Sequence, residues 1–527
     1  MLTLFSTLIK SLPCAKGGGL QRNPEGLYSF TRAFRDTRET FADQYLTRGG
    51  ICYIISICVL QGGFKVVFSG FMFLCLFLPV VLILYNLSKS IAYKNVILVI
   101  SSLFFYAWGE PVYVLLFMAS ILINYILGRI MDKFYAQRAG RAAFIGAVVI
   151  NLAFLGVFKY AGFLISNVNW LFGLSFPNPN IALPIGISFY TFQILSYIID
   201  VYNGKTRVQK SLIKFAAYVS MFPQLIAGHI VRYTDIAREL DSRHTSIDDF
   251  ADGIKKFTAG LCKKVIIANH AGSAASLLLD SPRFSAASAW LGIILYAFQI
   301  YFDFSSYSDM AIGLGRIFGF HFCKNFDYPY ISKSVTDFWR RWHISLSSFF
   351  RDYVYIPLGG NRYKATRNLF AVWMLTGLWH GASWNFIAWG LFYGIMLFIE
   401  KNSFRHFLQK LPRPLCYIYT MFIVLIGWAL FYYTDTASLI GWFKNAFGIG
   451  SSLYDLVTVT TLYSNLWLII VCVAACTPLP RIVFVNLCRR HKKFALICEP
   501  LLVAAGLAAC FILLAGQTYN PFLYFRF

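Results

Sequence analysis

Apolar residues occur in long runs along the chain, and short polar loops separate them. Several runs are long enough to cross roughly 30 Å of hydrocarbon as α-helices. Others are short or interrupted by glycine and proline, which is typical of re-entrant or interfacial pieces buried within protein. The pattern predicts an all-α, polytopic integral membrane protein with about ten or eleven spans. The candidate spans are 66–87, 95–108, 111–128, 142–160, 181–202, 211–230, 289–304, 306–320, 368–380, 384–399, 415–433, 462–476 and 494–515.

Residues 336–368, "TDFWRRWHISLSSFFRDYVYIPLGGNRYKATRN", combine apolar and cationic positions at helical spacing. At 100° per residue one stripe is apolar and the opposite face is polar. Pro357 and the Gly359–Gly360 pair end the predicted helix. Such a helix either lies at the cytoplasmic interface as a cationic surface or lines a polar cavity. The apolar stripe consists of Phe338, Trp342, Leu346, Phe349 and Tyr353, and the polar face of Arg340, His343, Ser347 and Arg351.

In the cavity interpretation, this stretch attracts an anionic donor from the cytoplasm. The cations that would do so are Arg340, Arg341, Arg362, Lys364 and Arg367.

"TGLWHGASW" places His380 between two apolar runs, with Gly377 and Gly381 close on either side. The glycines leave space for a substrate or for another backbone, and Trp379 and Trp384 add bulk around it. An ionisable side chain at membrane depth is costly and usually functional. The alternative is an ordinary buried histidine. A second histidine 37 residues earlier, His343, favours catalysis.

Carboxylates also interrupt apolar segments. "FQIYFDFSSYSDMAIGLGRIFGF" carries Asp303 and Asp309, six residues apart and therefore on different faces of a straight helix. "LPIGISFYTFQILSYIIDVY" carries Asp200. We expect hydrogen bonds to Tyr, Ser, Trp or Arg on neighbouring helices. Alternatively, Asp309 near Arg316 helps to build a polar tunnel.

Composition agrees with a membrane protein, because 58% of the 527 residues are hydrophobic and only 13% are charged. The net charge of +24 could suggest nucleic acid, but an excess of Lys and Arg in cytoplasmic loops explains it better. Loops 88–94, 129–141 and 203–214 are basic, whereas "GEP" at 109–111 and the uncharged loop 161–180 are predicted to face outwards. This assignment excludes nucleic acid as the expected partner.

Residues 1–65 are basic and would then have to lie on the outer side. They lack the ordered regions of a signal peptide. We interpret them as a dispensable extension or a start assigned too far upstream, with the working domain at 66–527. The competing interpretation is an extra span at 51–60.

The twelve cysteines lie mostly in apolar runs and include no C-x-x-C pair. Cys472 and Cys476 have a spacing that could bind metal, but no histidine or acid accompanies them, so packing is the better interpretation. The sequence predicts no metal site, and it contains no P-loop, dinucleotide fingerprint or transporter-like repeat.

Five long stretches together resemble membrane-bound O-acyltransferases, specifically the bacterial alginate O-acetyltransferase branch. The resemblance runs from about Val66 to the C-terminus and is densest over 181–400. The stretches are "LPIGISFYTFQILSYIIDVY", "SMFPQLIAGHIVRY", "QIYFDFSSYSDMAIGLGRIFGF", "NFDYPYISKSVTDFWRRWHISLSSFFRDYVYIPLGGNR" and "TGLWHGASWNFIAWGLFYG".

The resemblance implies an all-helical fold that encloses a central funnel in the bacterial inner membrane. It implies transfer of an acetyl group from a cytoplasmic donor, acetyl-CoA, towards an exported polysaccharide, with no bound cofactor. Many relatives work with an extracytoplasmic hydrolase-like acetyltransferase. The catalytic histidine of the family aligns with His380 and its second motif histidine with His343. We expect Arg340, Arg341, Trp379, Trp384, Asn385 and Asp309 to bind the donor or line the tunnel.

One departure from the family is "AGHI", where His229 replaces the usual proline and removes a rigid φ restraint. It is either neutral variation or a change to the tunnel.

Acyl transfer from a thioester to a hydroxyl needs a base for the hydroxyl proton, and a neutral His380 suits that role. Direct transfer is favoured because no Cys or Ser stands in a nucleophile motif; an acyl-histidine is the alternative route. Two rival functions stay open. One is a polysaccharide transporter or channel, and the other is a non-catalytic scaffold for a partner acetyltransferase.

Overall fold

We analysed a computed structural model of the chain. It describes residues 68–523 apart from 180, 226–229, 282–284 and 516–521. These residues belong to one compact unit. The predictions for the extension 1–65, the span 51–60, the start near Val66 and the role of His229 lie outside the described residues.

The described residues form helices and no strands, so the all-α prediction is confirmed for them. The first half of the chain contains α4 (Leu78–Asn86), α5 (Ile91–Gly109), α6 (Tyr113–Lys133), α7 (Arg138–Phe172), α8 (Ile187–Tyr202), α9 (Leu212–Ser220), α10 (Phe222–Leu225), α11 (Tyr233–Asp241), α12 (Ile247–Cys262), α13 (Asn269–Leu279) and α14 (Ala286–Ile317). The second half contains α15 (Val335–Arg341), α16 (Ile344–Phe350), α17 (Ala365–His380), α18 (Trp384–Ile399), α19 (Arg405–Lys410), α20 (Arg413–Tyr432), α21 (Thr436–Ala446), α22 (Leu456–Ser464), α23 (Leu466–Ala475), α24 (Leu479–Arg490) and α25 (Lys492–Ala515). Short π-helical turns occur at η1 (Phe73–Phe77), η2 (Lys263–Ala268), η4 (Arg351–Tyr355) and η5 (Glu400–Phe404), and a 3-10 turn at η3 (Pro329–Ile331).

Six described helices are long and apolar enough to cross a membrane, namely α5, α6, α7, α14, α20 and α25. The pair α22 and α23 adds a seventh span if the two helices, bent by 61°, count as one. This number is lower than the predicted ten or eleven, partly because the predicted span 66–87 contains only the shorter apolar helix Phe73–Asn86 and the predicted span 211–230 divides into the short helices α9 and α10. The segments α8, α17 and α18 are helices of only 16 residues each, and the predicted spans 289–304 and 306–320 are one continuous helix.

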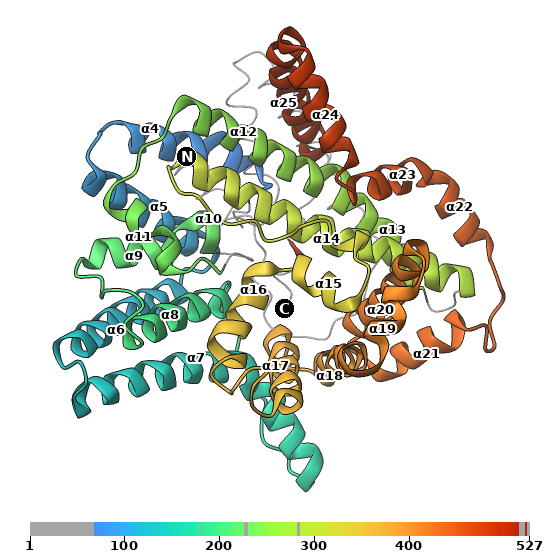
Figure 1. The fold of residues 1–527 in the computed structure, drawn as a ribbon, viewed down its shortest axis with the longest axis horizontal. Helices are drawn as coiled ribbons and strands as arrows, with labels where there is room; N and C mark the ends of the chain where they lie inside the picture. The colour runs from blue at the N-terminus through green and yellow to red at the C-terminus, as the bar shows by residue number, and fades with distance from the viewer. Residues whose placement is uncertain (1–67, 180, 226–229, 282–284, 516–521, 524–527) are drawn as a thin grey trace, which may run out of the picture. The chain divides into compact units, whose positions relative to one another are not determined.

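That continuous helix, α14, crosses the centre of the view in Figure 1, with α4–α11 on one side and α18–α23 on the other. Polar residues in its middle do not end it, and two of them, Asp303 and Ser306, have partners. Ser306 donates to the carbonyl oxygen of Asp303 at 2.6 Å. The Asp303 carboxylate pairs with Lys264 at 2.6 Å and accepts the backbone N–H of Leu523 at 2.7 Å. The prediction that this carboxylate bonds to residues outside its own helix is therefore confirmed, although its charged partner is a lysine rather than the predicted arginine.

Two large apolar clusters form the core, one including the first part of α14, from Ala289 to Phe304, and the other its last part, from Tyr307 to Ile317. A third, smaller cluster fills the space where α8, α16 and the end of α17 meet. It contains Phe192, which stacks on Phe349 with ring centroids 4.3 Å apart and lies 5.7 Å from Trp379. These rings connect the cationic stretch with the end of α17, where His380 lies.

Candidate active site

A cavity of about 930 Å³ contains both predicted catalytic histidines in its wall. Its lining comes from α15, α16, η4, α17, α18, η5, α19 and the start of α20. The polar lining residues include Lys333, Arg340, His343, Ser347, Arg351, Asn361, Thr376, His380, Glu400, Lys401, Gln409 and Arg413. The sequence placed the two histidines in separate motifs, and the fold brings them to one space.

The single helix predicted for the cationic stretch is wrong, because the chain breaks between α15 and α16. His343 has φ of +46° and ψ of +57°, the left-handed region that non-glycine residues seldom adopt. Asn325 holds this break, since its backbone oxygen accepts from Ile344 N and its side-chain oxygen accepts from Ser345 N. The predicted stripe is nevertheless buried. All four residues of the predicted polar face line the cavity, so the cavity interpretation holds.

The same asparagine orients the imidazole of His343. Its Oδ1 lies 3.3 Å from His343 Nδ1, and it already accepts from a backbone N–H, so it is oxygen rather than nitrogen that faces the ring. An oxygen acceptor requires a hydrogen on Nδ1. In the neutral ring Nε2 is then the accepting nitrogen.

His380 is the last residue of α17 and is 6% exposed. Its Nδ1 lies 2.7 Å from the carbonyl oxygen of Thr376, one turn earlier. A carbonyl only accepts, so Nδ1 carries the hydrogen, and Nε2 of the neutral ring has the basic lone pair. The rings of Trp389, Trp379 and Phe431 surround the imidazole with centroids 4.8, 4.9 and 5.4 Å away.

The glycines near His380 serve close packing of α17 against α18. A Cβ on Gly377 would lie 2.4 Å from the carbonyl oxygen of Phe386 and 3.3 Å from Gly390 Cα. A Cβ on Gly381 would lie 2.2 Å from the Phe386 ring. The glycines were predicted to leave space for a substrate or for another backbone. Gly377 leaves space for the backbone of α18, whereas Gly381 leaves space for the Phe386 ring.

Two residues of α7 that the sequence analysis missed hold the end of α17. Lys159 donates to the carbonyl oxygens of Trp379 and, at 3.3 Å, of His380. Tyr160 donates to the carbonyl oxygen of Leu378 at 2.6 Å. The signal was present, because Lys159 is a charged residue inside the predicted span 142–160.

Positive charge dominates the cavity wall. Five lining residues are cationic, namely Lys333, Arg340, Arg351, Lys401 and Arg413, whereas Glu400 is the one lining carboxylate among the described residues. Glu400 is engaged by α15, because it accepts from Val335 N at 2.6 Å and from Thr336 N at 2.9 Å. Arg351 is neutralised by Asp352, which lies outside the wall, at 2.6 Å. The other four cations have no ion pair within the described residues, so the wall can offer them to an anion.

The remaining predicted site residues lie outside this wall. Arg341 pairs with Asp337 at 2.9 Å. Trp379 is buried between the two histidines, with its ring 6.1 Å from that of His343. Trp384 is 63% exposed and donates to Asn167 at 2.9 Å, and Asn385 donates to the carbonyl oxygen of Leu430 at 3.3 Å. These four residues do not line this cavity, although Trp379 packs on both histidine rings. Their roles in donor binding or in a tunnel stay predictions.

Asp309 is also absent from the wall, because it forms ion pairs with Lys263 at 2.6 Å and Lys256 at 2.7 Å. The predicted neighbour Arg316 pairs with Asp252 instead. Asp309 therefore ties α14 to α12 and η2, and its role in a tunnel stays a prediction.

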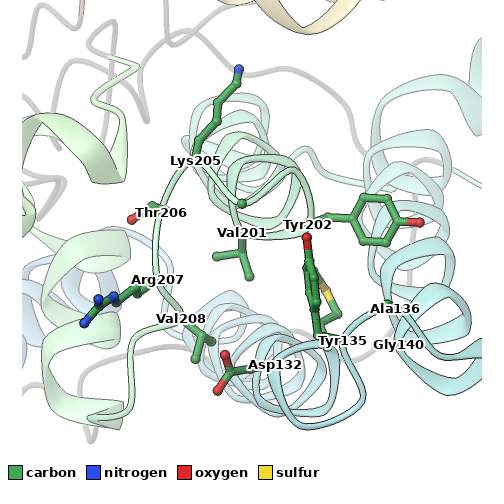
Figure 2. A pocket seen from close by; sticks show the side chains of 12 residues that line it. Asp132, Tyr135, Ala136, Gly140, Val201, Tyr202, Lys205, Thr206, Arg207 and Val208 are labelled. Carbon is green, nitrogen blue, oxygen red and sulfur yellow. The ribbon is translucent and has the colours of Figure 1, made fainter.

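A second cavity of about 420 Å³ lies between the α6–α7 turn and residues 201–208. Figure 2 shows that Lys205 and Arg207 extend away from the enclosed space. No histidine lines it. Of these two cavities, the larger one is therefore the candidate site.

Residues 204–440 match the sequence profile of the membrane-bound O-acyltransferase family. The chain is 46% identical over 373 residues to a probable alginate O-acetylase of Pseudomonas aeruginosa, covering 69% of this chain and 72% of that protein. The chain belongs to the membrane-bound O-acyltransferase family. The resemblance predicted from the motifs is thereby confirmed, and so are a polytopic membrane protein and O-acyltransferase activity.

Two further members of the family show the breadth of the similarity. A peptidoglycan O-acetyltransferase of Helicobacter pylori is 34% identical over 442 residues, covering 76% of this O-acyltransferase and 84% of that protein. A teichoic acid D-alanyltransferase of Bacillus subtilis is 29% identical over 330 residues, covering 56% of this chain and 80% of that protein.

Proposed function

We propose that this O-acyltransferase takes an acetyl group from acetyl-CoA in the cytoplasm and passes it across the inner membrane for O-acetylation of an exported polysaccharide. Two relatives support acetyl as the group, because their names describe an alginate O-acetylase and a peptidoglycan O-acetyltransferase. The higher identity to the alginate protein favours alginate or a similar exopolysaccharide as the polymer. The observation that carries the proposal is a single cavity with both buried histidines and five exposed cations in its wall. We call the exposed cations, Lys333, Arg340, Arg351, Lys401 and Arg413, the cationic mouth.

The cationic mouth suits a donor with phosphate groups. Arginine and lysine bind phosphate through charge-assisted hydrogen bonds. Basic loops of membrane proteins face the cytoplasm, where acetyl-CoA is present, and two of the mouth cations, Arg340 and Arg351, lie in the basic stretch 336–368. Along α17, the wall from Leu369 to His380 extends roughly 17 Å at 1.5 Å per residue. The apolar part of this wall accommodates the acyl-bearing arm of the donor, with its phosphates held at the mouth.

His380 acts as the general base in this proposal. Its Nε2 takes the proton of the acceptor hydroxyl while the hydroxyl oxygen attacks the thioester carbonyl carbon. The carbon–sulfur bond then breaks, and the leaving thiolate takes the proton back from the imidazolium. General-base help contributes roughly 10²- to 10⁴-fold to such a step. His343, in the same wall, orients the donor thioester.

The position of His380 suits an acceptor that arrives from the outer side. Helix α7 begins at the basic turn predicted to face the cytoplasm, and Lys159 lies about 32 Å along it at 1.5 Å per residue. The Lys159 ammonium lies 3.3 Å from the backbone oxygen of His380. This geometry supports an acetyl group that crosses while the donor stays inside, and it supports an extracytoplasmic hydrolase-like acetyltransferase as partner.

The test is transfer of label from radiolabelled acetyl-CoA in bacterial membranes that carry wild-type, His380→Ala or His343→Ala protein at matched levels. His491→Ala is the control, because His491 is exposed and outside the cavity. We expect His380→Ala to lose at least 100-fold of transfer and the control to keep it, and the labelled product identifies the acceptor as a partner protein or the polymer. Equal transfer by wild type and His380→Ala would show a transporter or a scaffold instead.

A further inference from the structure

Lys159 is a cation in the interior of the apolar helix α7, in the sequence "GVFKYAGF". A charged side chain in a membrane-spanning segment is energetically costly and persists where a partner or a function requires it. Its partners here are main-chain oxygens, because the ammonium donates to the carbonyls of Trp379 and His380. It also lies 5.8 Å from the centroid of the Trp379 ring. The cation is therefore directed at the residue pair that ends α17.

The end of a helix needs such a partner. The last carbonyl oxygens of an α-helix accept no hydrogen bond from an N–H of the same helix, and they form the negative end of its dipole. In α17 the carbonyl oxygen of Thr376 binds the imidazole of His380 itself. The carbonyl oxygen of Leu378 binds Tyr160, and those of Trp379 and His380 bind Lys159. The backbone that carries His380 is thus fixed to α7 by three hydrogen bonds.

We infer that Lys159 is a positioning residue, whose ammonium holds the end of α17 so that His380 Nε2 meets the reacting groups. The inference rests on the proposed role of His380 as base. Two consequences follow from the geometry. Without the cation, two carbonyls lose their donor and the end of α17 is released from α7. A displacement of about 1 Å at a catalytic group can cost roughly 10²-fold in rate. The donor mouth is formed by other elements and stays intact.

Because Lys159 holds the end of α17 while other elements form the donor mouth, Lys159→Met should change kcat and not KM. The methionine keeps the approximate length of the side chain and removes its charge and its hydrogen-bond donors. We expect kcat to fall by about 10- to 100-fold, with the KM for acetyl-CoA unchanged within a factor of two. Lys159→Arg keeps a cation and should recover most of the lost kcat. Tyr160→Phe removes one of the three hydrogen bonds and should lower kcat by about 2- to 5-fold.

The matched control is Lys444→Met, because Lys444 is an exposed lysine on α21, away from the cavity. Each variant is purified in detergent, and its fold is verified by thermal unfolding and size-exclusion chromatography before the assay. Folded Lys159→Met with wild-type kcat, or with raised KM and unchanged kcat, overturns the inference. If Lys159→Met does not fold, Tyr160→Phe decides, and an unchanged kcat there overturns it. Activity of His380→Ala would refute the proposed function instead, so the two failures are distinguishable.

Discussion

Replacing Gly377 with alanine puts a methyl group where α17 and α18 cross. The new Cβ would lie 2.4 Å from the carbonyl oxygen of Phe386, whereas ordinary contacts begin at 3.4 Å. The obstructing atoms are backbone and therefore cannot rotate away. Helix α18 has to move by about 1 Å, or α17 has to turn.

The expected cost has two parts, which different measurements report. Overpacking of this kind costs about 1–3 kcal/mol, and the higher helix propensity of alanine returns up to about 1 kcal/mol. The free energy of unfolding should therefore fall by roughly 1–2 kcal/mol. The activity should fall much more, because His380 follows three residues later and packs on Trp389 of α18 at 4.8 Å. A shift of about 1 Å there predicts a loss of roughly 10²-fold in kcat.

The assay compares kcat for acetyl transfer and the thermal unfolding of wild type and Gly377→Ala. Gly156→Ala is the control, since a Cβ on Gly156 of α7 meets no atom within 4 Å. We expect the control to keep its activity and to match or exceed the wild type in stability. A folded Gly377→Ala enzyme that retains at least half of the wild-type kcat would refute the view that this helix crossing fixes the histidine.

Two further predictions concern the cationic mouth. Arg340→Gln should raise the KM for acetyl-CoA by about 10- to 150-fold with kcat unchanged, which corresponds to the loss of one charge-assisted contact, while Arg489→Gln on α24 should change neither. The Asp352 carboxylate accepts hydrogen bonds from Arg351 at 2.6 Å and from Arg232 at 2.7 Å. Burial alone would raise the pKa of Asp352. The contacts with the two arginines outweigh burial and hold this pKa below its usual value. The ionised carboxylate thus stabilises the fold above about pH 4, and this contribution is lost as the pH falls through the lowered pKa. Asp352→Asn should therefore lower the unfolding temperature at pH 7, and the difference from the wild type should be smaller at about pH 3. An equal difference at both pH values would contradict a stabilising role of the ionised carboxylate.

The sequence predicted the helical class and both cavity histidines because long motifs and an intramembrane histidine are local signals. It also predicted the residues of the polar face, since helical spacing alone assigns them. It missed the break at His343, because the contacts that hold a left-handed backbone there come from Asn325, eighteen residues earlier. A stripe pattern carries no information about such a partner.

The length of α14 was missed for a related reason. The predicted spans 289–304 and 306–320 divide α14 close to Asp303, yet the partners of this carboxylate, Lys264 and Leu523, come from distant parts of the chain. Trp384 and Asn385 were assigned to the tunnel by proximity to His380 in sequence. The turn after α17 directs them elsewhere, so neighbours of a catalytic residue along the chain need not be its neighbours in space.

The rings around His380 also bear on the electrical insulation of the membrane. A cavity that reaches from one side of a bilayer to a deep histidine shortens the barrier that ions and protons would have to cross. Trp389, Trp379 and Phe431 surround the imidazole at 4.8 to 5.4 Å, and Phe386 fills the space beside Gly381. Their apolar bulk restores thickness to the barrier where the cavity ends. If the acyl group crosses as proposed, the same packing around His380 limits the leak of protons down their gradient.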